Sequence, residues 1–229
     1  IGDADPDRHY IHHPRHGHAD GGGLYPIVDC TGAGAFENGR RADGGAFVPV
    51  LLRPSFHADA AGGGGLGLFT AINRLRTVHE RIAAPLEAAG LPLLAQHVDP
   101  MDTGTLIDIF RAEEDTCLLG TDAVRDGVDV PGRSLRLIAF DRVPWPRPTI
   151  LHRARKAVFG GRRYDEMLTR LKLKQAYGRL LRRQGDRGVF VMLDRSLPTR
   201  LLSAFPDGVE VRRIGLAEAI RDVRTFLAE

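Results

Sequence analysis

The strongest constraint on the fold is a regular alternation, from Leu66 to the C-terminus, of short apolar runs with stretches whose apolar residues recur at helical spacing. The short apolar runs, predicted as strands, are 67–70, 91–97, 116–120, 134–140, 188–193 and 209–214. The helical stretches are 73–89, one capped by Asp102 or Thr103, 164–183, 199–204 and 216–227. Consecutive strands separated by helices pair in parallel. We therefore expect an α/β fold, with a mostly parallel sheet and helices on both faces.

Residues 1–46 lack this periodicity and are rich in glycine. Fifteen of the 27 glycines fall within residues 1–67, in runs that offer no side chain to bury. We expect residues 1–46 to form a mostly irregular segment, followed by a folded domain at 47–229. Several imidazoles lie close together in this segment, but no other ligand type accompanies them at a recognised spacing. We therefore favour a histidine-rich tail over a metal site for His9, His12, His13, His16 and His18.

Cysteine content and hydropathy narrow the class of protein further. Only Cys30 and Cys117 occur, too few for a four-cysteine zinc or iron–sulfur site or for a disulfide framework. A reducing, cytoplasmic setting is expected. No apolar run approaches the ~20 residues that cross a bilayer, so no membrane partner is expected. The chain starts at Ile1 rather than Met, which we take as a sign of a processed product or a piece of a longer gene product.

Positive charge is concentrated in one stretch of the chain. Between Arg147 and Arg187 there are thirteen Arg or Lys against three acids, a net charge of +10 in a chain whose total is +3. Such a block is typical of a surface that meets the phosphates of a nucleic acid or a nucleotide. The alternative is a solvated helix face that binds nothing.

One helix within this block carries a specific arrangement of side chains. Gln175, Arg179 and Arg182 are spaced four and three residues apart, so on a helix they lie within about 60° of one another. An amide and two guanidiniums on one face suit the γ-phosphate of a nucleoside triphosphate. Gly178 leaves space beside Arg179 for a ligand or another backbone. The alternative is an arginine-rich amphipathic helix whose core residues are Met167, Leu168, Leu171 and Leu181.

Two predicted strand ends carry polar residues suited to phosphates. After the strand at 116–120 we expect a polar loop at 121–132, where the hydroxyl of Thr121 and backbone amides could contact a phosphodiester. Asp126 or Asp129 in this loop could reach a nucleotide ribose or a metal-bound water. Thr70, at the end of another strand, carries a hydroxyl that could position a phosphate. The alternative is a plain surface loop.

Taken in order, three segments resemble motifs IV, V and VI of superfamily 2 DNA helicases of the DinG/XPD type. They are LFTA at 68–71, GTDAVRDGVDVPG at 120–132 and QAYGRLLRRQGDRG at 175–188. The connection DRVPWP at 141–146 is also similar to bacterial DinG-like proteins. The resemblance covers roughly residues 66–220. It implies that residues 47–229 form the second, RecA-like motor domain of such a helicase, of the P-loop NTPase type.

The resemblance also implies an ATP-driven motor that moves along single-stranded DNA, 5′ to 3′, and unwinds duplexes. Carried over to this sequence, it implies that Arg179 and Arg182 are catalytic as arginine fingers. The resemblance implies four nucleotide-binding residues, Gln175, Gly178, Asp126 and Asp129. The residues that it implies for DNA binding are Thr70, Gly120, Thr121, Arg125 and Trp145.

The sequence departs from a complete motor. There is no Gly-Lys pair and hence no Walker A motif, the only lysines being Lys156, Lys172 and Lys174. Asp165 and Glu166 follow each other at a predicted helix start, which is not the context of a DEAH-like box. We expect the ligands of ATP and Mg²⁺, and any iron–sulfur cluster, in a P-loop motor domain of the same full-length protein. The chain alone is expected not to hydrolyse ATP.

Two other hypotheses remain open from the residues alone. One is a stand-alone nucleic-acid or nucleotide-binding module that kept the fold and lost motor activity. The other is an unrelated α/β enzyme that uses the basic helix to bind a phosphorylated metabolite.

Overall fold

The computed structural model describes residues 27–30, 62–127, 129–130, 134–180, 187–206 and 209–228. The strands are β1 (Ile27–Cys30), β2 (Gly65–Leu68), β3 (Leu93–Ala95), β4 (Cys117–Gly120), β5 (Leu137–Phe140), β6 (Val189–Met192) and β7 (Val211–Ile214). The helices are α2 (Ile72–Ala88), α3 (Thr103–Ala112), α4 (Asp122–Gly127), α5 (Ile150–Val158), α6 (Arg162–Leu180), the 3-10 helix η3 (Thr199–Ala204) and α7 (Leu216–Ala228).

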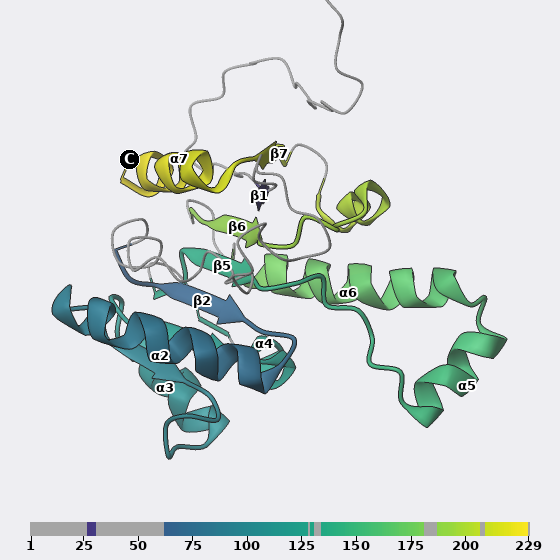
Figure 1. Cartoon of the computed structure of the whole chain (residues 1–229), viewed down its shortest axis with the longest axis horizontal. Helices are drawn as coiled ribbons and strands as arrows, with labels where there is room; N and C mark the ends of the chain where they lie inside the picture. The colour runs from purple at the N-terminus through teal and green to yellow at the C-terminus, as the bar shows by residue number, and fades with distance from the viewer. Residues whose placement is uncertain are drawn as a thin grey trace, which may run out of the picture.

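The strands form one sheet in the order β3-β4-β2-β5-β6-β1-β7, and every pairing in it is parallel. Figure 1 shows β2, β5, β6, β1 and β7 stacked side by side. The four residues of β2 pair in register with β4 on one side and β5 on the other, from Gly65 to Leu68. Because parallel strands end at the same edge, the residues that follow β2, β4 and β5 come together there. The predicted parallel α/β fold is confirmed.

Helices cover both faces of the sheet, as the alternation of side chains along the strands requires. In β6, Phe190 and Met192 pack with α3, α4, α6 and η3, whereas Val189 and Val191 point to the opposite face and pack with α2 and α7. All four side chains are buried, which explains why this strand reads as a continuous apolar run. Of the helices within the described ranges, none is long and apolar enough to cross a membrane.

Local signals explain where α2 ends and where α3 begins. The predicted apolar stripe of α2 is buried, and Gly90 adopts φ +72 just after the helix, as expected for a glycine stop. At α3 the cap is Asp102, whose Oδ1 accepts hydrogen bonds from the backbone N of Gly104 at 2.8 Å and of Thr105 at 3.1 Å. The Thr105 hydroxyl is the main cause that lowers the pKa of Asp102.

The structure differs from the sequence predictions at four places. Strand β1 (Ile27–Cys30) lies within the segment that we predicted to be mostly irregular, and it fits between β6 and β7. The predicted loop at 121–132 begins with the short helix α4. Helix α5 was not predicted, because the prolines before it indicated an extended connection. The predicted helix at 164–183 begins earlier, at Arg162, and residues 181–183 lie outside the described residues.

Candidate functional site

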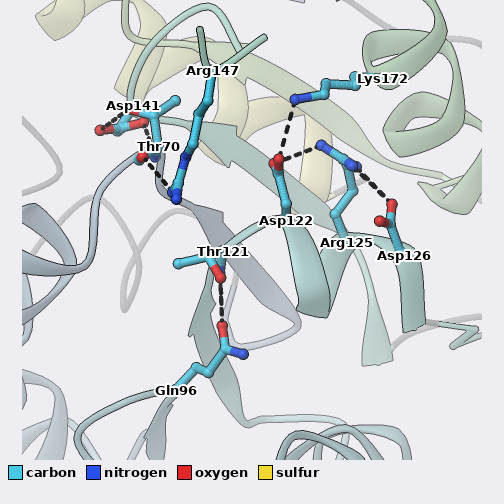
Figure 2. A network of polar contacts seen from close by, with 9 residues as sticks. All are labelled: Thr70, Gln96, Thr121, Asp122, Arg125, Asp126, Asp141, Arg147 and Lys172. Atoms are coloured by element: carbon cyan, nitrogen blue, oxygen red, sulfur yellow. Dashed lines mark hydrogen bonds and ion pairs between the residues drawn. The ribbon is translucent and has the colours of Figure 1, made fainter. Parts of the chain in front are cut away.

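A buried carboxylate joins the loops that follow β2 and β5. The side chain of Asp141, which follows β5, has no exposed surface. Its Oδ1 accepts a hydrogen bond from the backbone N of Thr70 at 2.9 Å, and its Oδ2 accepts one from Arg74 Nε at 2.6 Å. The Thr70 hydroxyl makes a longer contact with Oδ2, at 3.4 Å. Arg147 donates to the Thr70 carbonyl at 3.3 Å, as Figure 2 shows.

Asp141 was not among the predicted site residues. It directly follows the apolar run at 134–140, and an acid at the carboxyl end of a predicted parallel strand is the signal that could have found it. By accepting the hydrogen bond from the backbone N of Thr70, Asp141 fixes the start of the loop that connects β2 to α2.

Thr121 is held from the neighbouring loop by Gln96. The side-chain Oε1 of Gln96 accepts from both the backbone N of Thr121, at 2.9 Å, and its hydroxyl, at 2.8 Å. Gln96 Nε2 donates to the hydroxyl of Thr103 at 3.0 Å, which fixes the orientation of the amide. Gln96 and Thr121 are both buried. A threonine hydroxyl has one proton, and phosphate oxygens only accept, so in this arrangement the Thr121 hydroxyl has no proton left to donate to a phosphate.

Gly120 is required by packing at the end of β4. A Cβ added to Gly120 would overlap the side chain of Val124 in α4. The absence of a side chain therefore lets α4 fold back closely against the strand.

Helix α4 is the centre of a charged network that Figure 2 displays. Arg125 is buried, and its guanidinium pairs with two carboxylates of its own helix, Asp122 at 2.7 Å and Asp126 at 2.8 Å. Asp122 in turn accepts from Lys172 of α6 at 3.1 Å. The network uses three donors of Arg125, which explains how this charge is tolerated in a buried position.

Arg179 of α6 is tied to the same helix. Its Nη2 donates to the main-chain carbonyl of Asp126 at 3.2 Å, and among the described residues it makes no ion pair. Gln175 and Gly178 are exposed on the same helix, and a Cβ added to Gly178 would meet no atom within 4 Å. Arg182, the other predicted arginine finger, lies outside the described residues.

The buried face of α6 differs from the one expected for the alternative, an arginine-rich amphipathic helix. Met167 and Leu171 are half exposed, and the side chains that pack on the sheet are Leu173, Ala176, Tyr177 and Leu180. Leu181 lies outside the described residues. The surface that carries Gln175 and Arg179 therefore lies opposite a well-packed face.

Two predicted residues lie apart from this network. The backbone carbonyl of Asp129 accepts from Arg111 at 3.1 Å, on the side of α3. Trp145 is 38% exposed, and its backbone N donates to the Val143 carbonyl at 2.8 Å within the proline-rich connection. Asp194 accepts from Val143 N at 3.0 Å and holds that connection to the loop after β6.

The histidines of the predicted tail, His9, His12, His13, His16 and His18, lie outside the described residues. Over the ranges that the structure describes, no group of three or more His, Cys, Asp or Glu side chains is placed to hold a metal ion. The donors that reach the surface of α6 are the exposed amide of Gln175 and the part-exposed guanidinium of Arg179, and both groups suit phosphate oxygens.

Residues 57–211 match the model of the helicase C-terminal domain. The chain belongs to this family, as a domain of the DinG type. The ATP-dependent helicase DinG of Mycobacterium tuberculosis is 36% identical over 195 residues, which cover 82% of this chain and 28% of that protein. The ATP-dependent DNA helicase YoaA of Escherichia coli is 32% identical over 186 residues, covering 76% of this chain and 28% of that protein.

A solved structure shows the same fold at low identity. Saccharomyces cerevisiae Dbp5 bound to RNA and ADP BeF3 superposes with a TM-score of 0.55 at 13% identity, covering 89% of this chain and 45% of that chain. The RecA-like fold of this helicase C-terminal domain is thereby confirmed. The chain spans about 28% of the length of the curated DinG and YoaA relatives.

Proposed function

We propose that this chain is the second motor domain of an ATP-dependent DNA helicase and works with a P-loop motor domain of the same full-length protein. The observation that carries the proposal is the face of α6, where exposed Gln175 and part-exposed Arg179 stand beside the open space at Gly178. The relatives from M. tuberculosis and E. coli are named ATP-dependent helicases, which supports the reaction class.

In this proposal Arg179 is a catalytic residue that reaches the γ-phosphate of ATP bound by the P-loop domain. A guanidinium is always charged, donates several hydrogen bonds and neutralises the charge that develops on the phosphoryl oxygens. Gln175, one helical turn earlier, donates a hydrogen bond from its side-chain amide to the same phosphate. Arg182 is proposed as a second finger by its spacing. When bound, Mg²⁺ neutralises phosphate charge, and we propose that its ligands and those of any iron–sulfur cluster belong to the other domain.

Helix α4 is proposed to set the position of the finger. Arg125 holds Asp122 and Asp126 together, and the Asp126 carbonyl accepts from Arg179. We therefore propose that Arg125 acts as a positioning residue, since its buried guanidinium is already paired, and that Asp126 acts through its carbonyl. Asp129 is proposed to meet the nucleotide side as the resemblance implies.

The DNA path is proposed along the carboxyl ends of β2, β4 and β5. Trp145 offers a half-exposed ring on which a base can stack, a contact worth ~1 to 3 kcal/mol where it forms. Arg142 and Arg147 flank it and are both exposed, so their charges can meet phosphates. Thr70 and Thr121 are proposed to shape the path, held by Asp141 and Gln96, with Gly120 allowing the tight turn.

The proposed motor role also bears on the partners and the setting of the protein. We propose single-stranded DNA as the nucleic-acid partner and a cytoplasmic setting, since two cysteines are too few for a disulfide framework. A stand-alone binding module would keep the DNA path and lack any dependence on Arg179.

The test is the full-length polypeptide, assayed for ATP hydrolysis with and without single-stranded DNA. We expect hydrolysis that rises on DNA addition, and a log–log slope of DNA affinity against salt near −3 if about four phosphates are contacted. No stimulation by DNA, together with salt-independent binding, would favour an enzyme acting on a phosphorylated metabolite.

A further inference from the structure

Helix α5 presents large apolar side chains to solvent. Against the described parts of the chain it buries none of its residues. Ile150 is 82% exposed, Val158 is 77% exposed and Phe159, which ends the helix, is 63% exposed. Single exposed apolar residues are ordinary, but a cluster on one element marks an interaction surface.

The exposed side chains form a stripe along one side of the helix. At 100° per residue, Ile150, Leu151, Ala154 and Val158 fall within about 100° of one another. All four are exposed. We call them the α5 stripe.

The opposite side of α5 is held by α6. His152 Nε2 lies 2.8 Å from Asp165 Oδ1, and Lys156 Nζ lies 2.5 Å from Asp165 Oδ2. The His152 ring also stacks on Tyr164, with ring centroids 5.6 Å apart. His152 and Lys156 are about 200° and 240° around the helix from Ile150. The attachment to α6 therefore fixes the α5 stripe so that it faces away from its own domain.

The hairpin of α5 and α6 extends beyond the carboxyl edge of the sheet. Lys172 pairs with Asp122, the residue of α4 that follows β4 and Thr121, so this pair marks where α6 passes that edge. The ten residues from 162 to 171 then reach about 15 Å further. Figure 1 shows α5 at the far end of α6, away from the sheet.

Charge around the α5 stripe restricts what can cover it. Arg153 lies beside one edge and Arg155 beside the other, and both are exposed. A second copy would bring these arginines against each other, and like charges at an interface are unfavourable. The phosphates of a nucleic acid could pair with the arginines, but its bases stack on aromatic rings, and the α5 stripe consists of aliphatic side chains. The best match is an apolar protein surface rimmed with carboxylates.

We propose that the α5 stripe is a docking surface for the P-loop motor domain of the same polypeptide, through an apolar patch bordered by acidic residues. The inference rests on the proposed function. Arg162 and Arg179 are separated by about 26 Å along α6. A domain of about 150 to 200 residues is about 40 Å across, so one body that meets Arg179 is large enough to extend to α5 as well.

The test is photo-crosslinking in the full-length polypeptide, with p-benzoylphenylalanine placed at Leu151 or at Val158. A third variant carries the probe at Glu80, an exposed position of α2, as the matched control. We expect intramolecular crosslinks from Leu151 and Val158 to peptides of the P-loop domain, identified by mass spectrometry, and none from Glu80. Crosslinks to a second copy, to DNA, to residues of this same domain, or no crosslinks, would overturn the inference.

Charge variants provide an independent arm. The double change Arg153→Glu and Arg155→Glu is expected to lower the crosslink yield and the DNA-stimulated ATPase about tenfold, the effect of losing ~1.4 kcal/mol of contact. An unchanged yield would contradict the acidic rim. The ATPase of the unmodified protein separates the two proposals, since its absence refutes the motor, whereas normal ATPase with misplaced crosslinks refutes only the docking surface.

Discussion

Gln96 and Thr121, which are 25 residues apart in sequence, are joined by two hydrogen bonds to a single oxygen. Gln96 Oε1 accepts the Thr121 backbone N–H at 2.9 Å and the hydroxyl at 2.8 Å. The pair fixes the end of β4, from which the charged helix α4 starts. Because both residues are buried, loss of the Gln96 amide would leave the backbone N–H and the hydroxyl of Thr121 without this acceptor.

Changing Thr121→Val removes the hydroxyl bond and keeps the backbone bond. We expect a loss of about 1 kcal/mol in the free energy of unfolding, and about 1 to 3 kcal/mol for Gln96→Leu, which strands the buried N–H of Thr121. Urea denaturation followed by circular dichroism measures both. Thr77→Val on the exposed surface of α2 is the control and should change stability by less than about 0.5 kcal/mol. Equal effects at Thr77 and Thr121 would contradict the buried bond.

The pair of Arg74 and Asp141 is asymmetric, since the carboxylate has no exposed surface and the arginine side chain is 25% exposed. Changing Arg74→Met leaves a charge buried and should cost about 3 kcal/mol. Combining it with Asp141→Asn should recover part of that loss, because the amide oxygen still accepts from Thr70 N and no charge remains. Denaturation of the single and double variants measures the coupling. Strictly additive losses would refute the interpretation.

The contact between α5 and α6 is predicted to depend on pH. Burial raises the pKa of Asp165, but hydrogen bonds from Lys156 and His152 outweigh it and hold the pKa below the ordinary 3.8. A carboxyl with a depressed pKa stabilises the folded state above its unfolded pKa, and this contribution is lost as pH falls through the folded value. The stability difference between the unaltered chain and Asp165→Asn should therefore shrink as the pH falls below about 4. A constant difference down to acid pH would contradict the pairing.

Cys117 in β4 is predicted to be chemically inert in the folded chain. Burial raises the pKa of its thiol to about 11, so only ~0.1% is thiolate at pH 8. In a Cys30→Ser background, which leaves Cys117 as the one thiol, a disulfide reagent should react slowly in buffer and rapidly in urea. Rapid labelling under native conditions would show that β4 is accessible.

The fold was largely readable from the alternation of strands and helices, and the exceptions have physical reasons. Strand β1 is four residues in glycine-rich surroundings, and its partners β6 and β7 lie at the other end of the chain. Helix α5 follows three prolines, and none of its residues is fully buried in the described domain, so it shows no buried apolar stripe in the sequence. Its signal was the cap at Thr149, whose hydroxyl accepts from His152 N at 3.1 Å.

The sequence predicted several residues of the candidate site, but few of the contacts between them. The pairing of Asp122 with Arg125 follows from spacing of three on a helix. The pairing of Asp122 with Lys172 joins residues 50 apart, which only the fold brings together. Arg125 was predicted to contact DNA. In the structure it is buried, and its guanidinium is paired with Asp122 and Asp126 of its own helix.

The most direct test of the motor role is a comparison of Arg179→Ala with Lys174→Ala in the full-length polypeptide. Lys174 is an exposed cation on the same helix and serves as the control. With Arg179→Ala, ATP turnover should fall about 10³-fold or more, while affinity for single-stranded DNA changes by less than about threefold, and Lys174→Ala should leave turnover nearly unchanged. Equal losses of turnover and DNA affinity with Arg179→Ala would instead make α6 part of the DNA surface and contradict the account.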